Sequence, residues 1–397
     1  MLYPVTKLLI LKVFSFKIMN YPIYLDYAAT TPMDKRVLEV MLPYFTQHFG
    51  NAGSRQHAYG WVAAEAVATA RRQVADCIGA AAKEIIFTSG ATEAINLAIK
   101  GTSQSSSRGK KHIITITTEH KATLEVCKSL ESQGVEVSYL PVDSHGTLDL
   151  NILKNTIQEN TILISLLWGN NETGVIHPIK DITAIAHASN ILVHVDATQT
   201  VGKIPVSVTE LSIDLLSFSS HKIYGPKGVG ALFIKKGVSV LSQQHGGGQE
   251  RNLRGGTLNI SGIVGFGEAC KLASEEIEEN KRIEKLRDLL EALLQEKLSG
   301  IKINDQHADR LSHISNISFP KVDGEELLMR LNKIAISNGS ACNSAATEPS
   351  HVLKAMGLSN ELAYASVRFS LGRFTNDEDI HTAASHVISV YHSIINS

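Results

Sequence analysis

The sequence has few cysteines, almost no excess of either charge and no long apolar run. Its four cysteines are spread over 397 residues without a Cys-x-x-Cys pair, which argues against a disulfide framework or a structural zinc site and fits a reducing, cytoplasmic compartment. The 38 Lys and Arg residues nearly balance the 39 Asp and Glu residues, so no overall field attracts the chain to nucleic acid or to a membrane. The 16 histidines form no His-Glu-x-x-His pattern, and we predict no catalytic metal.

The N-terminus carries an apolar stretch that is not convincing as a signal peptide. The segment LLILKVFSF is interrupted by Lys12, is too short to span a bilayer and is not followed by a small-residue cleavage site. Met19 stands just before the first stretch that reads like a domain. We predict that residues 1–18 are an extension or a misassigned start, with a weak targeting segment as the alternative.

The middle of the chain alternates between short β-branched runs and segments with helical spacing. This pattern indicates an α/β domain with a mostly parallel sheet that helices cover on both faces. After about residue 278 a charged amphipathic helix and shorter strands indicate an α+β domain. We therefore expect a large domain over 32–277 and a small C-terminal domain over 278–397. The runs of the large domain are 84–88, 112–117, 135–140, 161–167, 191–195 and 215–218.

Polar clusters follow five of these runs. In open parallel sheets, ligands bind outside the carboxyl ends of the strands, so the clusters are expected to converge on one crevice. Any one of them, taken singly, is equally well explained by capping or turn chemistry. Their convergence is the signal for a binding site. The clusters are SGATEA, TEHKA, WGNNETG, DATQT and SSHK.

Three of the clusters point to one kind of ligand. The turn from Ser89 to Thr92 joins a strand to a helix, where backbone N–H groups and the helix dipole suit a phosphate. Asp196 ends an apolar strand, where a protonated ring nitrogen is a natural partner for a buried carboxylate. Lys222 offers an amine that can condense with an aldehyde. Simple helix caps at Ser89, Thr92 and Asp196 and a solvated Lys222 are the alternatives.

A phosphate cradle, an acid for a pyridinium and a reactive lysine together describe a pyridoxal 5′-phosphate (PLP) site. At this point the sequence resembles the class I cysteine desulfurases of the NifS/IscS type, within the fold-type I PLP-dependent enzymes of aminotransferase class V. The resemblance covers the chain from about Tyr24 to Arg373. It rests on LDYAATTP, FGNAGSRQH, FTSGATEAINLAIKG, TEHKA, NNETG, HVDATQ, SFSSHKIYGPKG, HGGGQERNLRGGT, NGSACNSA and RFSLGRFT.

The resemblance implies the fold and the cofactor contacts. The fold is α/β, a large domain with a mostly parallel sheet plus a smaller α+β C-terminal domain, and residues 19–31 pack with the small domain. Lys222 corresponds to the lysine that is covalently linked to PLP, Asp196 to the partner of the pyridine nitrogen, and Gln199 to the donor to the ring hydroxyl. The phosphate ligands correspond to Ala91, Thr92, Ser219, His221 and, from the neighbouring subunit of a homodimer, Thr257.

The resemblance also implies the substrate contacts. His120 corresponds to the residue that stacks on the cofactor ring and assists proton transfer. Asn171, which also contacts the cofactor, and Arg368 correspond to the pair that holds the substrate carboxylate. The planar fork of arginine suits that task.

One cysteine differs from the other three. Cys77, Cys127 and Cys270 fall within helix-like segments, where cysteine is usually a small buried hydrophobe. Cys342 lies in NGSACNSA, among small and polar residues without apolar periodicity, so we expect an exposed loop. Such a loop suits a nucleophile that attacks sulfur beside the cofactor and then delivers it to a partner. A plain loop cysteine is the alternative.

The implied activity is PLP-dependent removal of sulfur from L-cysteine, which leaves L-alanine and a persulfide on Cys342. The sulfur is then expected to pass to acceptor proteins for iron–sulfur cluster or other sulfur-cofactor synthesis. An iron–sulfur scaffold is one such acceptor, although the chain ends soon after its last predicted helix. One alternative is a selenocysteine lyase, in which the same attack would act on selenium. The other is a fold-type I β-lyase or aminotransferase, which would have no need for Cys342.

Overall fold

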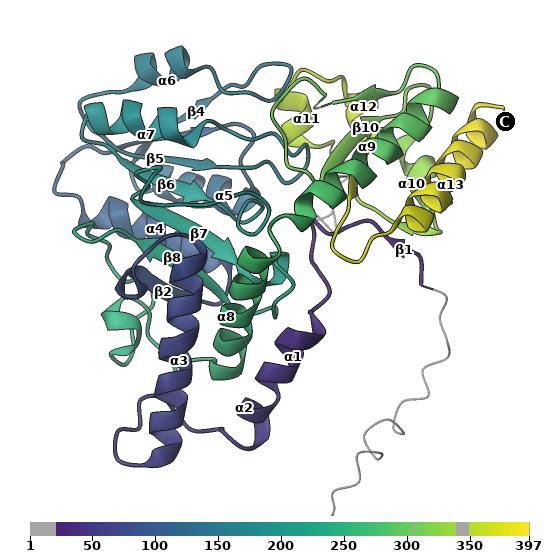
Figure 1. Cartoon of the computed structure of the whole chain (residues 1–397). Coiled ribbons are helices and arrows are strands. Elements are labelled where there is room, and N and C mark those ends of the chain that lie inside the picture. The colour runs from purple at the N-terminus through teal and green to yellow at the C-terminus, as the bar shows by residue number, and fades with distance from the viewer. Residues whose placement is uncertain (1–20, 305, 339–348, 397) are drawn as a thin grey trace, which may run out of the picture.

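The computed structural model describes residues 21–304, 306–338 and 349–396 (Figure 1). Two predictions, the extension at 1–18 and the exposed loop around Cys342, lie outside these residues. The described residues form a seven-stranded, a three-stranded and a two-stranded sheet. None of the helices in the described part of the chain is long and apolar enough to cross a membrane.

The seven-stranded sheet has the order β2-β8-β7-β6-β5-β3-β4. All neighbours pair in parallel except β8, which runs antiparallel to β2 and β7. The predicted mostly parallel sheet is therefore confirmed. Its strands are β2 (Ile85–Thr88), β3 (His112–Ile116), β4 (Glu136–Leu140), β5 (Thr161–Leu167), β6 (Leu192–Asp196), β7 (Leu215–Ser219) and β8 (Gly230–Ile234).

Helices cover both faces of this sheet because its central strands are apolar on both sides. Ile113 and Ile114, neighbours on β3, are fully buried and belong to two different hydrophobic clusters on opposite faces. One face packs against α4 (Ala91–Ser105) and α5 (Lys121–Glu131). The other packs against α1 (Lys35–Met41), α3 (Ala58–Cys77), α6 (Leu150–Thr156), α7 (Ile179–Ala188) and α8 (Ile260–Glu275).

The three-stranded sheet is antiparallel and has its own hydrophobic cluster. Leu25 from the N-terminal segment joins this cluster, and β1 (Ile23–Tyr24) pairs with β11 (Ile334–Ala335) as a separate two-stranded sheet. The strands are β9 (Lys302–Ile303), β10 (Ile314–Ser318) and β12 (Ser366–Ser370), and the helices packed on them are α9 (Glu279–Lys297), α10 (Gly324–Arg330) and α13 (Asp377–Ile395).

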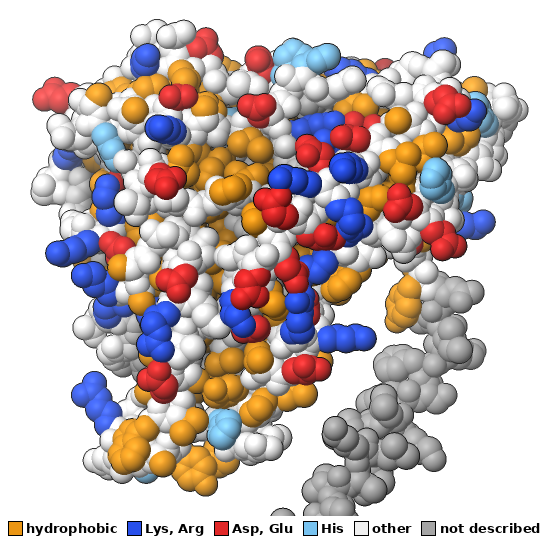
Figure 2. Space-filling view, in the orientation of Figure 1, with side chains coloured by type: hydrophobic (Ala, Val, Ile, Leu, Met, Phe, Trp, Pro, Cys, Tyr) orange, Lys and Arg blue, Asp and Glu red, His pale blue; other side chains and the backbone are white. Residues whose placement is uncertain are grey.

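Short helices complete the chain. They are α2 (Pro43–Thr46), α11 (His351–Ala355), α12 (Asn360–Tyr364) and the 3-10 helices η1 (Ala82–Glu84), η2 (Ser220–Lys222) and η3 (Gln249–Asn252). Large apolar side chains are exposed around α2 and the start of α3, at the lower end of the molecule in Figure 2. We call this the lower apolar surface; it consists of Leu42, Phe45, Phe49, Tyr59 and Trp61.

The three cysteines predicted to be helical lie in helices. Cys127 in α5 and Cys270 in α8 are buried, as predicted. Cys77, the last residue of α3, is half-buried rather than fully buried, and it packs against the hydrophobic cluster of the large sheet. The three thiols are free.

Candidate active site

The polar clusters that follow the strands line one cavity of about 570 Å³ at the carboxyl ends of β2, β3, β5, β6 and β7. The structure therefore brings the five clusters together, as the sequence predicted. All but two of the predicted catalytic and binding residues line this cavity: Ala91, Thr92, His120, Asn171, Asp196, Gln199, Ser219, His221, Lys222 and Arg368. Thr257 is exposed and does not line it, and Cys342 lies outside the described residues.

The start of α4 offers free backbone donors to the cavity. Gly90 precedes the helix, and no side chain of the described residues caps it. The alternative of a plain cap by Ser89 or Thr92 is therefore wrong. The first N–H groups of a helix have no partner within it and lie at the positive end of the dipole. Because Ala91 and Thr92 face the cavity, these donors are available to an anion.

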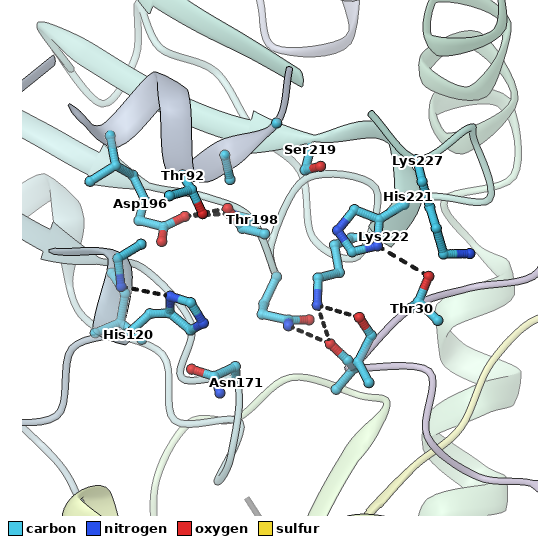
Figure 3. A pocket seen from close by; sticks show the side chains of 18 of the residues that line it. Thr30, Thr92, His120, Asn171, Asp196, Thr198, Ser219, His221, Lys222 and Lys227 are labelled. Carbon is cyan, nitrogen blue, oxygen red and sulfur yellow. Dashed lines mark hydrogen bonds between the residues drawn. The ribbon is translucent and has the colours of Figure 1, made fainter. Parts of the chain in front are cut away.

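Lys222 projects into the cavity from η2, directly after β7 (Figure 3). Its Nζ donates a short hydrogen bond to the carbonyl oxygen of Ala28 and a second one, of 2.8 Å, to that of Ala29. Gln199 Nε2 also donates to the Ala28 oxygen, at 2.9 Å. The N-terminal segment thus forms one wall of the cavity, and Lys222 is not a solvated surface lysine.

Asp196 ends β6 and is 6% exposed. Its Oδ1 accepts a hydrogen bond of 2.9 Å from the Thr198 backbone N–H and a short one from the Thr198 hydroxyl. The carboxylate therefore caps a turn rather than a helix, and one oxygen is held by Thr198. Asp196 also lines the cavity, so its carboxylate suits a protonated ring nitrogen.

His120 precedes α5 and faces the same side of the cavity as Asp196 (Figure 3). Its Nδ1 accepts a hydrogen bond of 3.1 Å from the Ala122 backbone N–H. Burial lowers the pKa of His120 below its usual value. The imidazole is therefore neutral near pH 7, and its ring proton is on Nε2.

His221 lies on the opposite side of the cavity, near Lys227 (Figure 3). Its Nδ1 lies 3.1 Å from the Thr30 hydroxyl. Burial, followed by the positive charges of Lys222 and Lys227, lowers the pKa of His221 to about 4. When Thr30 donates to Nδ1, the neutral ring carries its proton on Nε2 and can donate it to an anion.

Arg368 reaches the cavity from the middle of β12. Its Nη1 donates to the backbone oxygen of Asn171 at 2.8 Å, and its Nη2 donates to Asp26 Oδ1 at 2.7 Å. The Nε–H is buried and has no acceptor among the described residues. A buried donor without a partner is costly, so this N–H suits a ligand oxygen.

Comparison with known proteins agrees with this geometry. Residues 23–382 match the family Aminotransferase class-V. The chain belongs to this family. It is 51% identical over 365 residues to a cysteine desulfurase IscS of Anaeromyxobacter sp. (strain Fw109-5), covering 91% of this chain and 90% of the relative. The assignment to the NifS/IscS type is thus confirmed.

Solved structures of similar proteins share the fold. A NifS-like protein superimposes with a TM-score of 0.87 at 39% identity, covering 94% of this chain and all (100%) of the other. SspA in complex with cysteine superimposes with a TM-score of 0.80 at 37% identity, covering 89% of this chain and 100% of the other. The predicted α/β class V fold is confirmed.

The residues of the cavity fit PLP, the cofactor of this family. The uncapped start of α4, the hydroxyl of Ser219 and the Nε2 of His221 suit the phosphate, and Asp196 suits the ring nitrogen. Lys222 is within the same cavity. The individual roles of these residues stay predictions.

Sequence reasoning missed three residues that support the site. Thr198 holds Asp196, Thr30 contacts His221, and Asp26 holds Arg368. Thr198 lies in the DATQT cluster, two positions after Asp196. This spacing indicates an Asx turn, in which an aspartate side chain bonds the backbone two residues further on. Asp26 and Thr30 lie far along the chain from their partners, and nothing in the sequence pairs them.

Proposed function

We propose that this chain is a PLP-dependent cysteine desulfurase that removes sulfur from L-cysteine, releases L-alanine and retains a persulfide on Cys342. The observation that carries the proposal is the convergence of Lys222, Asp196, His120 and Arg368 on one cavity with the uncapped start of α4. Relatives about half identical are cysteine desulfurases, and the similar SspA structure contains cysteine.

The chain's residues would hold PLP by opposite ends. The start of α4, Ser219 and His221 hold the phosphate, and Asp196 holds the ring nitrogen. When bound, PLP supplies an aldehyde that takes up the substrate amine and a ring that accepts the electrons left by the α-proton.

Two side chains handle the protons of the reaction. Lys222 Nζ would act as the general base that removes the α-proton of the substrate. His120 Nε2 carries a proton in the neutral ring and faces the cavity, so it can donate there. Arg368 and Asn171 orient the substrate by its carboxylate.

Cys342 receives the sulfur. Its thiolate attacks the substrate sulfur, and the new S–S bond forms as the C–S bond breaks. The three-carbon fragment takes up one proton at Cβ, regains its α-proton and leaves as L-alanine. One L-cysteine and one thiol therefore become one L-alanine and one persulfide. The persulfide is the form that an acceptor protein takes over.

We further propose a cytoplasmic homodimer with two domains per chain. The lower apolar surface, with Phe45 58% and Phe49 65% exposed, is of the kind that marks a protein interface, and Thr257 is exposed as required for contact with a neighbouring subunit.

The separate hydrophobic clusters support a large domain over 32–277 and a small one over 278–397. Acceptor proteins for iron–sulfur cluster synthesis are the proposed partners.

The test is to incubate the pure PLP-loaded protein with L-cysteine and a reductant and to quantify L-alanine and sulfide. We expect equal amounts of both. The Cys342→Ala variant should keep the PLP absorbance and bind L-cysteine but release almost no sulfide, because it lacks the attacking thiolate. Pyruvate in place of L-alanine, or normal sulfide release by Cys342→Ala, would contradict the proposal and favour a β-lyase.

A further inference from the structure

We infer that Asp26 is a positioning residue that orients the guanidinium of Arg368 towards the carboxylate of the substrate. The inference rests on the proposed function, in which Arg368 binds that carboxylate. Asp26 belongs to the segment LDYAATTP, which lies 342 residues before Arg368 in the chain.

Arg368 is held on three sides. Its backbone N–H donates to Ser337 at 2.7 Å, its Nη1 to the Asn171 oxygen at 2.8 Å, and its Nη2 to Asp26 Oδ1 at 2.7 Å. Asn171 provides a neutral backbone oxygen, whereas Asp26 provides a charged one. The guanidinium is charged in both bonds, but only the bond to Asp26 adds attraction between opposite charges, so Asp26 is the stronger of the two side-chain restraints.

Burial makes the counter-charge necessary. The side chain of Arg368 is 5% exposed and that of Asp26 is 18% exposed. A guanidinium taken out of water without an acidic partner is strongly unfavourable. Without Asp26 the guanidinium would therefore turn towards water or another acceptor and lose its orientation.

The orientation leaves the right donors free. Guanidinium has five N–H groups, and the bonds to Asn171 and Asp26 use two of them. The Nε–H is buried without an acceptor among the described residues, and Arg368 lines the cavity. Because two of its three nitrogens are held, the plane of the fork is set before a carboxylate arrives.

The backbone of Asp26 is itself fixed. Leu25 accepts a hydrogen bond of 2.8 Å from the Ser370 N–H, Tyr27 donates one of 3.2 Å to the Ser370 oxygen, and the Tyr24 hydroxyl donates one of 3.1 Å to the Asp26 oxygen. The strand that carries Arg368 thus also holds the segment that carries Asp26. This arrangement lets one carboxylate act as a rigid support rather than as a mobile surface charge.

The test compares two ligands that differ only in the carboxylate. L-Alanine and ethylamine are titrated into the PLP-loaded protein, and dissociation constants are measured from the change in PLP absorbance. For Asp26→Ala we expect the constant for L-alanine to rise about tenfold or more, because a hydrogen-bonded charge pair is lost, while that for ethylamine changes less than about twofold. Asp26→Asn, which keeps an acceptor oxygen, should lie between Asp26→Ala and the unmodified protein.

A double substitution shows whether Asp26 acts through Arg368. If it does, Asp26→Ala has no further effect on L-alanine binding in the Arg368→Ala background. Asp34→Asn is the matched control, since Asp34 pairs with Arg36 at 2.7 Å and Arg373 at 2.6 Å and does not line the cavity. It should leave the ratio of the two constants unchanged.

The outcomes separate the inference from the proposed function. The inference is overturned if Asp26→Ala weakens the binding of L-alanine and of ethylamine equally. It is also overturned if the effects of the two substitutions on L-alanine affinity multiply in the double variant. Loss of L-alanine preference in Arg368→Ala but not in Asp26→Ala overturns the inference alone. Retained preference in Arg368→Ala contradicts the role of Arg368 in the proposed function, and with it the role of Asp26.

Discussion

Single side chains in this site are held in place by hydrogen bonds with neighbouring residues. Asp196 is the clearest case, because both contacts of its Oδ1 come from Thr198. A carboxylate with one oxygen already bonded cannot rotate freely, so its other oxygen is held in place. The same principle applies at Arg368, where Asn171 and Asp26 hold the two Nη atoms and the buried Nε–H has no acceptor among the described residues.

Replacing Thr198 by Val should therefore weaken cofactor binding. The substitution keeps the shape but removes the hydroxyl that donates to Asp196, and a hydrogen bond to a charged group contributes about 1.5–3 kcal/mol. We expect the PLP dissociation constant to rise about tenfold, measured from absorbance after equilibrium dialysis. Thr198→Ser, which keeps the hydroxyl, should bind like the unmodified protein; equal binding by Thr198→Val would show that the backbone N–H of Thr198 suffices.

At the scale of residues, the sequence predicts which polar side chains follow a strand. It does not predict which residues hold those side chains in place. The residues that line the cavity were predictable because strand and polar cluster are adjacent in the chain. The partner of His221 was not, since Thr30 reaches it across 191 positions. The Nδ1 contact of His120 with Ala122 N–H is local, yet only the folded geometry shows which ring nitrogen keeps the proton.

At the scale of elements, the site depends on how closely β8 approaches the turn before α4. Gly230 starts β8 and pairs with Thr88 at the end of β2. A Cβ atom at Gly230 would lie 2.7 Å from the Gly90 Cα and carbonyl carbon and 2.7 Å from the Phe218 oxygen. All three are backbone atoms, so no side chain can move aside. The absence of a side chain at 230 is what lets the turn sit against the sheet.

Gly230→Ala should disturb both stability and cofactor binding. Overpacking of this kind costs about 1–3 kcal/mol, and the displaced turn carries the N–H groups at the start of α4. We expect a lower urea midpoint and weaker PLP retention, measured by fluorescence and absorbance. Gly109→Ala is the control, because a Cβ there has no neighbour within 4 Å. A Gly230→Ala variant as stable as Gly109→Ala would show that the turn relaxes freely.

The strands were largely readable from the sequence, but their arrangement was not. The run 161–167 corresponds to β5 (Thr161–Leu167) without a shift, because its apolar residues are buried on both faces. The order of the strands depends on pairings between distant segments. The antiparallel place of β8 between β2 and β7 had no local signal, and for that reason the role of Gly230 could not be predicted.

Across the whole molecule, neutral histidines are built into the interior. His194 on β6 bridges its neighbours in the sheet, with Nδ1 2.8 Å from the Ser165 hydroxyl and Nε2 3.1 Å from the Ser217 hydroxyl. Burial lowers its pKa to about 3. His177 is also fully buried, and burial lowers its pKa to about 4. Both must stay uncharged in the folded chain, whereas the unfolded chain imposes no such condition.

The fold should therefore lose stability as the pH falls below about 6.5, where an unfolded histidine takes up a proton. Between that pH and the depressed pKa values of the folded chain, the unfolded state binds more protons, so the free energy of unfolding decreases with decreasing pH. Each such histidine contributes a slope of up to about 1.4 kcal/mol per pH unit.

His194→Gln removes one of these groups, so its urea midpoint should fall less steeply between about pH 6.5 and pH 4.5, whatever its stability at neutral pH. His245→Gln, at an exposed position, serves as control. Parallel curves for His194→Gln and the unmodified protein would mean that His194 does not govern the acid sensitivity.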